Sequence, residues 1–356
     1  MGHDGLGDTG QLSWPAIPPI DASAESQARA RQDSLTKPAG SLGRLEALSI
    51  QLAGITGAAR PSVARKAVIV MAGDHGVTAE GVSAFPAAVT AQMVLNFAQG
   101  GAAINVLARQ AGARVVVVDV GVAADLSEAP GVLVRKIALG TANMAQGPAM
   151  TRAQAEAAVR VGLDVVAAEI ERGLDLVATG DMGIGNTTAS SAIVAAITRQ
   201  PAALVTGRGT GVDDAGLRRK IAIIERALAL NRPDPRDALD VLSKVGGLEI
   251  GGLAGVMIGA AARRVPVVVD GFISGAAAMI AVGLCPGLRP YLIAAHQSVE
   301  IGHRVMLDHL GLHPLLDLDL RLGEGTGAVL AFHLAEAATR ILSEMATFAE
   351  AGVSDQ

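Results

Sequence analysis

Short apolar segments alternate with longer segments of helical character along most of this chain, beginning near residue 66. The apolar segments occupy residues 67–71, 115–118, 174–179, 203–206, 265–269 and 291–295. Strands that are apolar at every position are buried on both faces, as in parallel sheets covered by helices on each side. The segments between them include 151–172 and 213–230, which are long enough to be helices. The pattern therefore predicts an α/β fold with a six-stranded, parallel, Rossmann-like sheet flanked by helices.

Polar or glycine residues follow each predicted strand at its carboxyl end. These endings are Asp74-His75, Asp119, Gly180-Asp181, Gly207, Asp270 and His296. The carboxyl ends of parallel strands share one edge of a sheet, and open α/β sheets bind ligands in the crevice outside that edge. We therefore expect the functional site to lie there.

The segment GDMGIGNTT, residues 180–188, joins one of these strands to a predicted helix over residues 189–198. Glycines let the backbone approach a ligand closely, and the free N–H groups at a helix start favour an anion. Thr187 and Thr188 add hydroxyls that can cap the helix or contact a phosphate. Many strand–helix turns are rich in glycine simply to turn, so this segment indicates a phosphate or nucleotide site without establishing one.

Glu324 lies between glycines in the segment RLGEGTGA, residues 321–328. Its sequence neighbours carry no side chains to shield it, so its carboxylate can project into a cleft. In an apolar cleft, desolvation raises the pKa of a glutamate and makes it a competent general base. The alternative is an incidental acid in a glycine-rich loop.

Three histidines have two interpretations each. His75 follows Asp74 directly, and the two either form an acid–base pair or tie down a loop. His296 and His303 are seven residues apart, which predicts one shared helix face. They either contribute to a metal site or serve helix packing and hydrogen bonding, and no cluster of Cys or Asp joins them.

Composition and charge exclude several functional classes. Of 356 residues, 50% are hydrophobic but only 2% are aromatic, so Ala, Val, Leu and Ile must build the core. The net charge of −5, without a basic tract, argues against a nucleic-acid partner. Cys285 is the only cysteine, which excludes an internal disulfide and suits a reducing compartment. The P-loop motif is missing, and GLGDTG at residues 5–10 matches the dinucleotide fingerprint only by chance, since no strand precedes it.

One uncharged window, residues 271–288, is long enough to resemble a membrane span. It contains four glycines and Pro286 and follows a strand-like run, so a buried strand and helix explain it better. The first residues lack the basic start and apolar run of a signal peptide. We therefore expect a soluble, cytoplasmic protein without a membrane partner.

Seven motifs, in their order and spacing, resemble those of nicotinate-nucleotide–dimethylbenzimidazole phosphoribosyltransferase. They are KPAGSLGRLE, AGDHGV, VTAQMVLNF, GDMGIGNTT, GRGTGVDD, VDGFISGAAA and LGEGTGA, and the resemblance extends from about Lys37 to the carboxyl end. It implies transfer of the phosphoribosyl group of nicotinate mononucleotide to 5,6-dimethylbenzimidazole or a related base. The products would be nicotinate and α-ribazole 5′-phosphate, formed with inversion at C1′ during assembly of the cobalamin nucleotide loop. It also implies a homodimer that needs no metal or other cofactor.

The resemblance further implies a role for individual residues. Glu324 would be the general base that takes the N–H proton of dimethylbenzimidazole, and Asp181 would be a second acid near the ribose, where many relatives carry Glu. The implied substrate-binding residues are Gly183, Gly185, Gly207, Gly209 and Lys220 around the phosphate, Ser83, Phe85, Gln92 and Met93 on the benzimidazole side, and also Asn186, Thr187 and Gly323. Phe85 offers a stacking surface for a flat bicyclic base.

The chain is expected to divide into three parts. Residues 1–33 are rich in Gly, Pro, Ala and polar residues and predict a partly ordered arm. The resemblance implies a small helical domain from residues 34–60 and 329–356, beside a large α/β mononucleotide-binding domain over residues 61–328. Lys37 and Arg44, in a turn-rich segment that opens a helix, either meet a phosphate or partner subunit or are solvated charges.

Two other functional classes remain as alternatives. A dinucleotide-dependent oxidoreductase on a similar sheet is disfavoured because no fingerprint occurs at a strand–helix turn. A non-catalytic nucleotide-binding or regulatory protein would bind nicotinate mononucleotide, but its function would not depend on Glu324.

Overall fold

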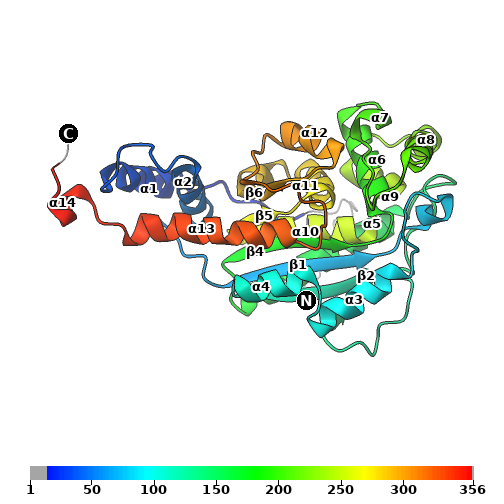
Figure 1. Ribbon diagram of the computed structural model, residues 1–356, viewed down its shortest axis with the longest axis horizontal. Helices are drawn as coiled ribbons and strands as arrows, with labels where there is room; N and C mark the ends of the chain where they lie inside the picture. The colour runs from blue at the N-terminus through cyan, green and yellow to red at the C-terminus, as the bar shows by residue number, and fades with distance from the viewer. Residues whose placement is uncertain (1–13, 355–356) are drawn as a thin grey trace, which may run out of the picture.

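A parallel sheet of six strands forms the centre of the computed structural model, which describes residues 14–354 (Figure 1). The strand order is β3-β2-β1-β4-β5-β6, and every neighbouring pair is parallel. The strands are β1 (Lys66–Gly73), β2 (Ala113–Gly121), β3 (Val132–Val134), β4 (Leu176–Met182), β5 (Val267–Val269) and β6 (Leu292–Ala294). The predicted α/β fold with a six-stranded parallel sheet is confirmed.

One of the six predicted strands is wrong, and another strand takes its place. Residues 203–206 lie mostly in the short helix α7 (Ala202–Val205), which starts directly after Pro201. A four-residue apolar run does not distinguish a strand from a buried helical turn. The sixth strand is β3, which has only three residues at the edge of the sheet and is not fully buried. Its apolar run was therefore too short to predict a strand.

The alternation of side chains along β1 explains why the sheet carries two cores. Ala67, Ile69 and Met71 belong to one buried cluster, whereas Val68 and Val70 belong to the cluster on the opposite face. Successive side chains of a strand point to opposite faces, so a strand that is buried on both sides must be apolar throughout.

The larger core lies under helices α5 (Arg152–Glu171), α10 (Leu248–Ala262) and α11 (Phe272–Leu284). Glycines let α5 and α10 pack backbone against backbone. A Cβ at Gly162 would lie 1.9 Å from the carbonyl oxygen of Gly252, and one at Gly255 would lie 1.9 Å from that of Val159. The predicted helices over 151–172, 189–198 and 213–230 and the helix within 271–288 are confirmed as α5, α6 (Asn186–Thr198), α8 (Asp214–Asn231) and α11. Helix α9 (Ala238–Val245) lies on the same side of the sheet.

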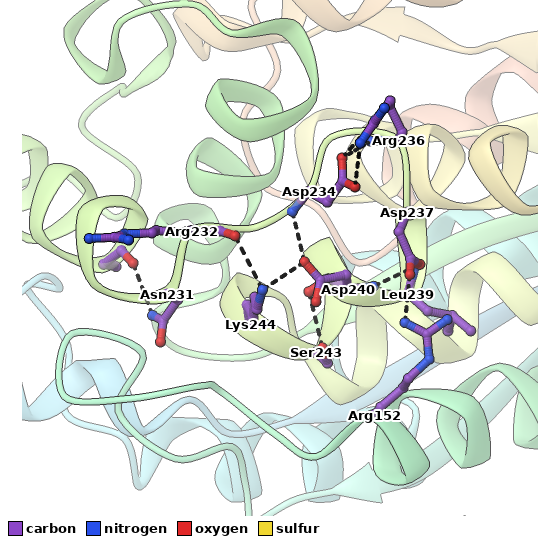
Figure 2. A network of polar contacts seen from close by, with 11 residues as sticks. Arg152, Asn231, Arg232, Asp234, Arg236, Asp237, Leu239, Asp240, Ser243 and Lys244 are labelled. Atoms are coloured by element: carbon purple, nitrogen blue, oxygen red, sulfur yellow. Dashed lines mark hydrogen bonds and ion pairs between the residues drawn. The ribbon is translucent and has the colours of Figure 1, made fainter.

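Salt bridges and hydrogen bonds on the surface fix the connection between α8 and α9, as Figure 2 shows. The Asp240 carboxylate accepts from the Asp234 backbone N–H at 2.7 Å and pairs with Lys244 at 2.8 Å. Asp237 caps α9 and pairs with Arg152 at the start of α5, at 2.7 Å. These contacts join three helices on the face of the larger core.

The second face of the sheet is covered by α3 (Val89–Gln99), α4 (Ala103–Gln110) and α13 (Thr326–Glu344) (Figure 1). Phe97 and Phe332 are among the large, fully buried side chains of this core. Figure 1 shows that α13 begins beside the sheet and runs on to α1 and α2. The predicted boundary at residue 329 therefore falls inside a continuous helix.

Both ends of the described chain contribute to one helical group. Helix α1 (Ala22–Ser34) packs on α2 (Arg44–Thr56) and α13, and α14 (Phe348–Ala351) follows α13 (Figure 1). Ala28, Ile50 and Leu342 form a buried cluster between these helices. The helix predicted to open after the turn-rich segment is α2. Within the predicted arm, residues 22–33 are helical, and residues 1–13, including the chance fingerprint, lie outside the described residues. The division into domains stays a prediction.

The remaining elements of the fold are short. They are η1 (Gly76–Glu80), η2 (Pro286–Tyr291), β7 (His296–Gln297), α12 (Ile301–Leu310) and β8 (Leu316–Asp317). Helix η2 leads into the amino end of β6, and the others follow the carboxyl end of β1 or β6. Among residues 14–354, no helix is long and apolar enough to cross a membrane.

Candidate active site

A cavity of about 380 Å³ opens at the carboxyl ends of β4 and β5. The chain builds β1, β2 and β3 in one direction and then returns to place β4 on the other side of β1, so the strand order reverses beside this cavity. Such switch points are where open α/β sheets bind ligands. The lining residues are Phe85, Val89, Met93, Asp181, Met182, Gly183, Ile184, Asn186, Thr187, Gly209, Thr210, Asp270, Gly271, Phe272, Ile273, His296, Ser298, Glu300, Arg321, Leu322, Gly323 and Glu324.

Glu324 is held in the cavity wall by an unusual backbone conformation. Gly323, Glu324 and Gly325 have φ angles of 83°, 62° and 92°, so three consecutive residues are left-handed. A non-glycine residue in this region is strained, and such strain is concentrated at functional sites. β4 approaches this loop at Gly180, where an added Cβ would lie 2.3 Å from the carbonyl oxygen of Glu324. The glutamate is therefore placed by backbone packing and has little freedom to move.

The Glu324 carboxylate is buried with one backbone donor among the described residues. Its Oε2 accepts from the N–H of Ile104, in the first turn of α4, at 3.3 Å. Burial raises its pKa, the hydrogen bond from Ile104 opposes this shift, and the negative charge of Asp270 adds to it. A carboxylate with a raised pKa and few hydrogen bonds has the properties of a general base.

Asp181 and Asp270, together with Glu324, form an acidic group of lining residues, which we call the acidic floor of the cavity. Asp181, at the end of β4, is buried and accepts from Asn186 Nδ2 at 2.9 Å. Burial, together with the charges of Asp270 and Glu249, raises its pKa well above the usual value. The side chain also lies close to the Glu324 loop, because a Cβ at Gly323 would be 3.1 Å from Asp181 Oδ2. A positive charge in this cavity would be stabilised by these carboxylates.

Asp270 follows β5 and holds the start of α13. Its two carboxylate oxygens accept from the backbone N–H groups of Ala328 at 2.9 Å and Gly325 at 3.3 Å. His296 Nε2 lies 3.7 Å from the same carboxylate. Burial raises the pKa of Asp270, while the charge of His296 and the backbone donors act against that shift. Asp270 therefore both anchors the Glu324 loop and contributes charge to the floor.

The glycine loop packs tightly against the end of β1. A Cβ at Gly183 would lie 2.4 Å from the carbonyl oxygen of Gly73, and Gly185 has a φ of 95° at the N-cap of α6. Asn186 and Thr187, in the first turn of α6, line the cavity, so the positive end of the helix dipole and the Thr187 hydroxyl lie where an anion is favoured.

A buried ion pair packs against the glycine loop at Gly183 and Gly185. His75 Nε2 and Glu249 Oε1 are 2.7 Å apart, and both side chains are inaccessible to solvent. Burial lowers the pKa of His75, but the charge and hydrogen bond of Glu249 more than offset that effect, so the pKa is raised. The loop-tying interpretation of His75 is the one that the geometry supports, and its partner is Glu249 rather than Asp74.

Lys220 supplies a buried cation behind the cavity. Its Nζ donates to Thr187 Oγ1 at 2.6 Å and lies 3.0 Å from the position of a Cβ at Gly209. Burial lowers its pKa to about 8, and the charge of Glu300 opposes that shift. Gly209 itself donates its N–H to Glu300 Oε1 at 2.8 Å. The Lys220 ammonium group and the Glu300 carboxylate therefore both lie beside Gly209.

The rim of the cavity is apolar on the side of α3. Phe85 is half exposed and Met93 partly buried, and both face the cavity. Thr210 accepts from the N–H of Ala84 at 3.0 Å, and its hydroxyl lies 3.2 Å from Ser83 Oγ. This rim is therefore hydrogen-bonded to the glycine loop at residues 207–211.

The structure brings most of the predicted site residues into one cavity. Nine line it: Asp181, Glu324, Phe85, Met93, Gly183, Asn186, Thr187, Gly209 and Gly323. Lys220, Ser83 and Gly207 do not line the cavity themselves but contact the lining residues Thr187, Thr210 and Glu300 respectively, and Gly185 lies between the lining residues Ile184 and Asn186 in the chain. Gln92 is exposed on α3 beside Met93 and does not line the cavity.

Sequence reasoning missed Asp270, His296, Ser298 and Glu300 as site residues. A signal was present for the first two, since both end predicted strands at the carboxyl edge of the sheet. Ser298 and Glu300 follow the short strand β7, whose two residues carry no recognisable strand pattern. Only their place in the fold identifies them.

Other expectations are corrected by the structure. His296 lies in β7 and His303 in α12, so they share no helix, although their rings are 6.2 Å apart. His303 Nδ1 accepts from the Ser298 N–H at 2.9 Å, and burial together with the charge of His296 lowers its pKa to about 3. Among the residues described, no group of three or more His, Cys, Asp or Glu side chains is arranged to hold a metal ion.

The two basic residues of the turn-rich segment both make polar contacts within the described chain. Lys37 is buried and pairs with Glu46 at 2.8 Å. Arg44 donates to the backbone carbonyl of His313 at 2.7 Å and also to that of Pro314. Both side chains therefore hold structure together away from the cavity.

A cavity with an acidic floor, a glycine loop and a buried lysine, at the switch point of a parallel sheet, is typical of α/β enzymes that bind phosphorylated small molecules. A family model described as phosphoribosyltransferase matches residues 17–353. The chain belongs to this phosphoribosyltransferase family. It is therefore an enzyme, and neither an oxidoreductase nor a non-catalytic nucleotide-binding protein.

Curated relatives and solved structures agree with this assignment. Nicotinate-nucleotide–dimethylbenzimidazole phosphoribosyltransferase of Chloroflexus aggregans is 66% identical over 340 residues, which is 96% of each chain. The relative of the same name from Roseiflexus sp. (strain RS-1) is 67% identical over 338 residues, 95% of this chain and 96% of the relative. The crystal structure of CobT from Thermus thermophilus superposes with a TM-score of 0.91 at 52% identity, covering 94% of this chain and all of that one.

Proposed function

We propose that this enzyme transfers the phosphoribosyl group of nicotinate mononucleotide to 5,6-dimethylbenzimidazole, in the assembly of the cobalamin nucleotide loop. The products are nicotinate and α-ribazole 5′-phosphate. The observation that carries the proposal is the buried Glu324 carboxylate beside two further carboxylates, in a cavity with an apolar rim. The names of the relatives, which specify nicotinate nucleotide and dimethylbenzimidazole, support the choice of substrates.

Glu324 acts as the general base in this proposal. One ring nitrogen of dimethylbenzimidazole attacks C1′ of the ribose, while the N–H proton of its other nitrogen passes to Glu324. The raised pKa of Glu324 makes this transfer more favourable than it would be for an exposed glutamate. The rigid loop around Glu324 fixes the base on one side of the cavity, as an inverting displacement requires.

The acidic floor stabilises the charge that develops at the ribose. As the C1′–N bond breaks, the bonding electrons return to the pyridinium nitrogen, so nicotinate leaves without a general acid. The ribose then carries oxocarbenium character, which Asp181 and Asp270 stabilise electrostatically in a site shielded from water.

The two ends of the cavity suit the two substrates. The helix start at Thr187, the glycines at 207 and 209 and the cation of Lys220 suit the phosphate of the mononucleotide. Phe85 and Met93 provide flat and flexible apolar contacts for the benzimidazole ring. Gln92 is exposed and would contact the base only if α3 or the rim moves on binding.

Glu324→Ala tests the proposal directly. We expect nicotinate release from the two substrates to fall by at least about 10²-fold, the scale of a lost general base. Glu171→Gln is a matched control, because Glu171 is exposed at the carboxyl end of α5, opposite the cavity. Turnover by Glu324→Ala that equals the wild type would assign the base elsewhere. The homodimer stays a prediction, which a measurement of mass in solution tests.

A further inference from the structure

Glu300 lies where the proposed function places a phosphate. Its Oε1 accepts the Gly209 N–H at 2.8 Å, so it already uses a backbone donor of the glycine loop. Its side chain lies against Gly207, where a Cβ would be 2.0 Å from Oε2. Glu300 thus binds the same glycine loop that was assigned to the phosphate, and it does so as an anion.

The second oxygen of this carboxylate has no hydrogen-bond partner among the described residues. Oε2 is inaccessible to solvent, and the Glu300 residue is 7% exposed although it lines the cavity. A buried carboxylate oxygen without a partner is costly, so such a group is expected to have a functional reason. Lys220, whose Nζ adjoins the same glycine, is the nearby cation, but its described hydrogen bond goes to Thr187.

Two anions cannot share this position without a cost. A phosphate that accepts the Gly209 N–H would stand within a few ångströms of the Glu300 carboxylate, and like charges so close repel strongly in a buried site. Either the carboxylate leaves when phosphate arrives, or the phosphate binds elsewhere. The position of Glu300 in the chain permits the first outcome, because it is the N-cap of α12 and its neighbours Val299 and Ile301 are exposed.

We propose that Glu300 is an internal anion that occupies the phosphate position in the empty enzyme and is displaced when the phosphate of the substrate binds. In the empty state it keeps the loop at residues 207–211 and the cation of Lys220 in a binding-competent arrangement. The free energy needed to displace Glu300 lowers the affinity for phosphate. The lower affinity also lets the phosphorylated product leave. Glu300 is a specificity-determining residue of the anion site, and this inference rests on the proposed function for the identity of the substrate.

Glu300→Gln tests the proposal, because it keeps the shape of the side chain and removes its charge. Binding of inorganic phosphate and of nicotinate mononucleotide is measured by calorimetry for the wild type, Glu300→Gln and the control Glu171→Gln. We expect both ligands to bind Glu300→Gln at least about tenfold more tightly than the wild type, with the control unchanged. Turnover should show the same gain as a lower KM for nicotinate mononucleotide and an unchanged KM for dimethylbenzimidazole.

Three outcomes of the binding measurements would overturn the inference. Equal or weaker binding of both ligands by Glu300→Gln would mean that Glu300 only holds the loop. Weaker binding of the mononucleotide with unchanged binding of inorganic phosphate would assign Glu300 to the ribose hydroxyls instead. Absence of phosphate binding by both wild type and variant would remove the anion site itself. A wild type that binds phosphate as expected but releases no nicotinate would refute the proposed function and leave the role of Glu300 standing.

A second measurement on the wild-type enzyme covers the case in which the variant does not fold. In a crystal structure with nicotinate mononucleotide bound, we expect the Gly209 N–H to donate to a phosphate oxygen, with the Glu300 carboxylate displaced from it. A Glu300 carboxylate that still accepts from Gly209, beside a bound phosphate, would contradict the proposal.

Discussion

Gly180→Ala places a single methyl group between β4 and the loop that carries Glu324. The added Cβ would lie 2.3 Å from the carbonyl oxygen of Glu324, 2.7 Å from its carbonyl carbon and 3.0 Å from the nitrogen of Gly325. All three atoms belong to the backbone, so no side chain can rotate away. The perturbation therefore acts on the position of the proposed base without changing any charge.

The size of the effect follows from the contact distances. Ordinary Cβ contacts begin at 3.4 Å, so the two backbones must separate by about 1 Å. β4 is held on one side by β1, where Gly180 pairs with Val70, and on the other by β5, so the loop is the part that yields. A displacement of that size at a reacting group costs about 10²-fold in rate.

Steady-state turnover and thermal unfolding together test this reasoning. We expect kcat to fall about 10²-fold in Gly180→Ala, whereas the KM for nicotinate mononucleotide changes little, because the proposed phosphate site lies on other loops. Gly147→Ala is the matched control, since a Cβ there meets nothing within 4 Å and its φ is not positive. The control should retain wild-type kcat and a melting temperature close to that of the wild type.

A folded Gly180→Ala enzyme with wild-type kcat would refute the reasoning. It would show that the Glu324 loop tolerates a shift, or that catalysis does not depend on its position. An unfolded variant would instead show that β4 and the loop cannot separate, which contradicts the expectation that the loop yields. The decisive comparison is kcat between two folded alanine variants.

Two further predictions concern pH. Burial and the charge of Asp270 raise the pKa of Glu324, so the acid limb of the kcat/KM profile should have its midpoint above pH 4.5. Asp270→Asn should move that midpoint to lower pH. A midpoint that does not move would show that Asp270 does not raise the pKa of Glu324. Lys220 loses its charge as the pH rises through about 8, so binding of nicotinate mononucleotide should weaken above that pH in the wild type. Lys220→Met should bind weakly at every pH, and a wild-type-like pH profile in this variant would contradict the assignment.

Much of the fold could be predicted because parallel strands buried on both faces leave a clear pattern. The apolar runs at β1, β2 and β4 mark the middle of the sheet, where β1 is buried throughout and most residues of β2 and β4 are buried. The error at residues 203–206 and the missed strand β3 share one cause. Both segments are three to four residues long, and at that length the environment decides between helix and strand.

The site was predictable where chemistry and backbone signals coincide in one segment. Glu324 stands between glycines, and the structure shows that these glycines have positive φ angles. Asp181 and Lys220 came from the resemblance, since neither residue is distinctive by itself. Asp270 was visible as a strand ending, but its meeting with Asp181 depends on β4 and β5 being neighbours in the sheet.

Contacts between distant segments could not be predicted. Glu249 lies near the start of α10 and pairs with His75, which is 174 residues earlier in the chain. Glu300 reaches Gly209 across 91 residues. Neither pair leaves a local pattern, because the partners are brought together only when the helices and loops pack at the carboxyl edge of the sheet.

The configuration of the product tests the central claim most directly. Purified enzyme would be incubated with nicotinate mononucleotide and dimethylbenzimidazole, and the anomeric proton of the riboside phosphate would be assigned by nuclear magnetic resonance. We predict one equivalent of nicotinate and a product of α configuration only. A β-configured product, or no riboside phosphate despite binding of the mononucleotide, would contradict direct displacement assisted by Glu324.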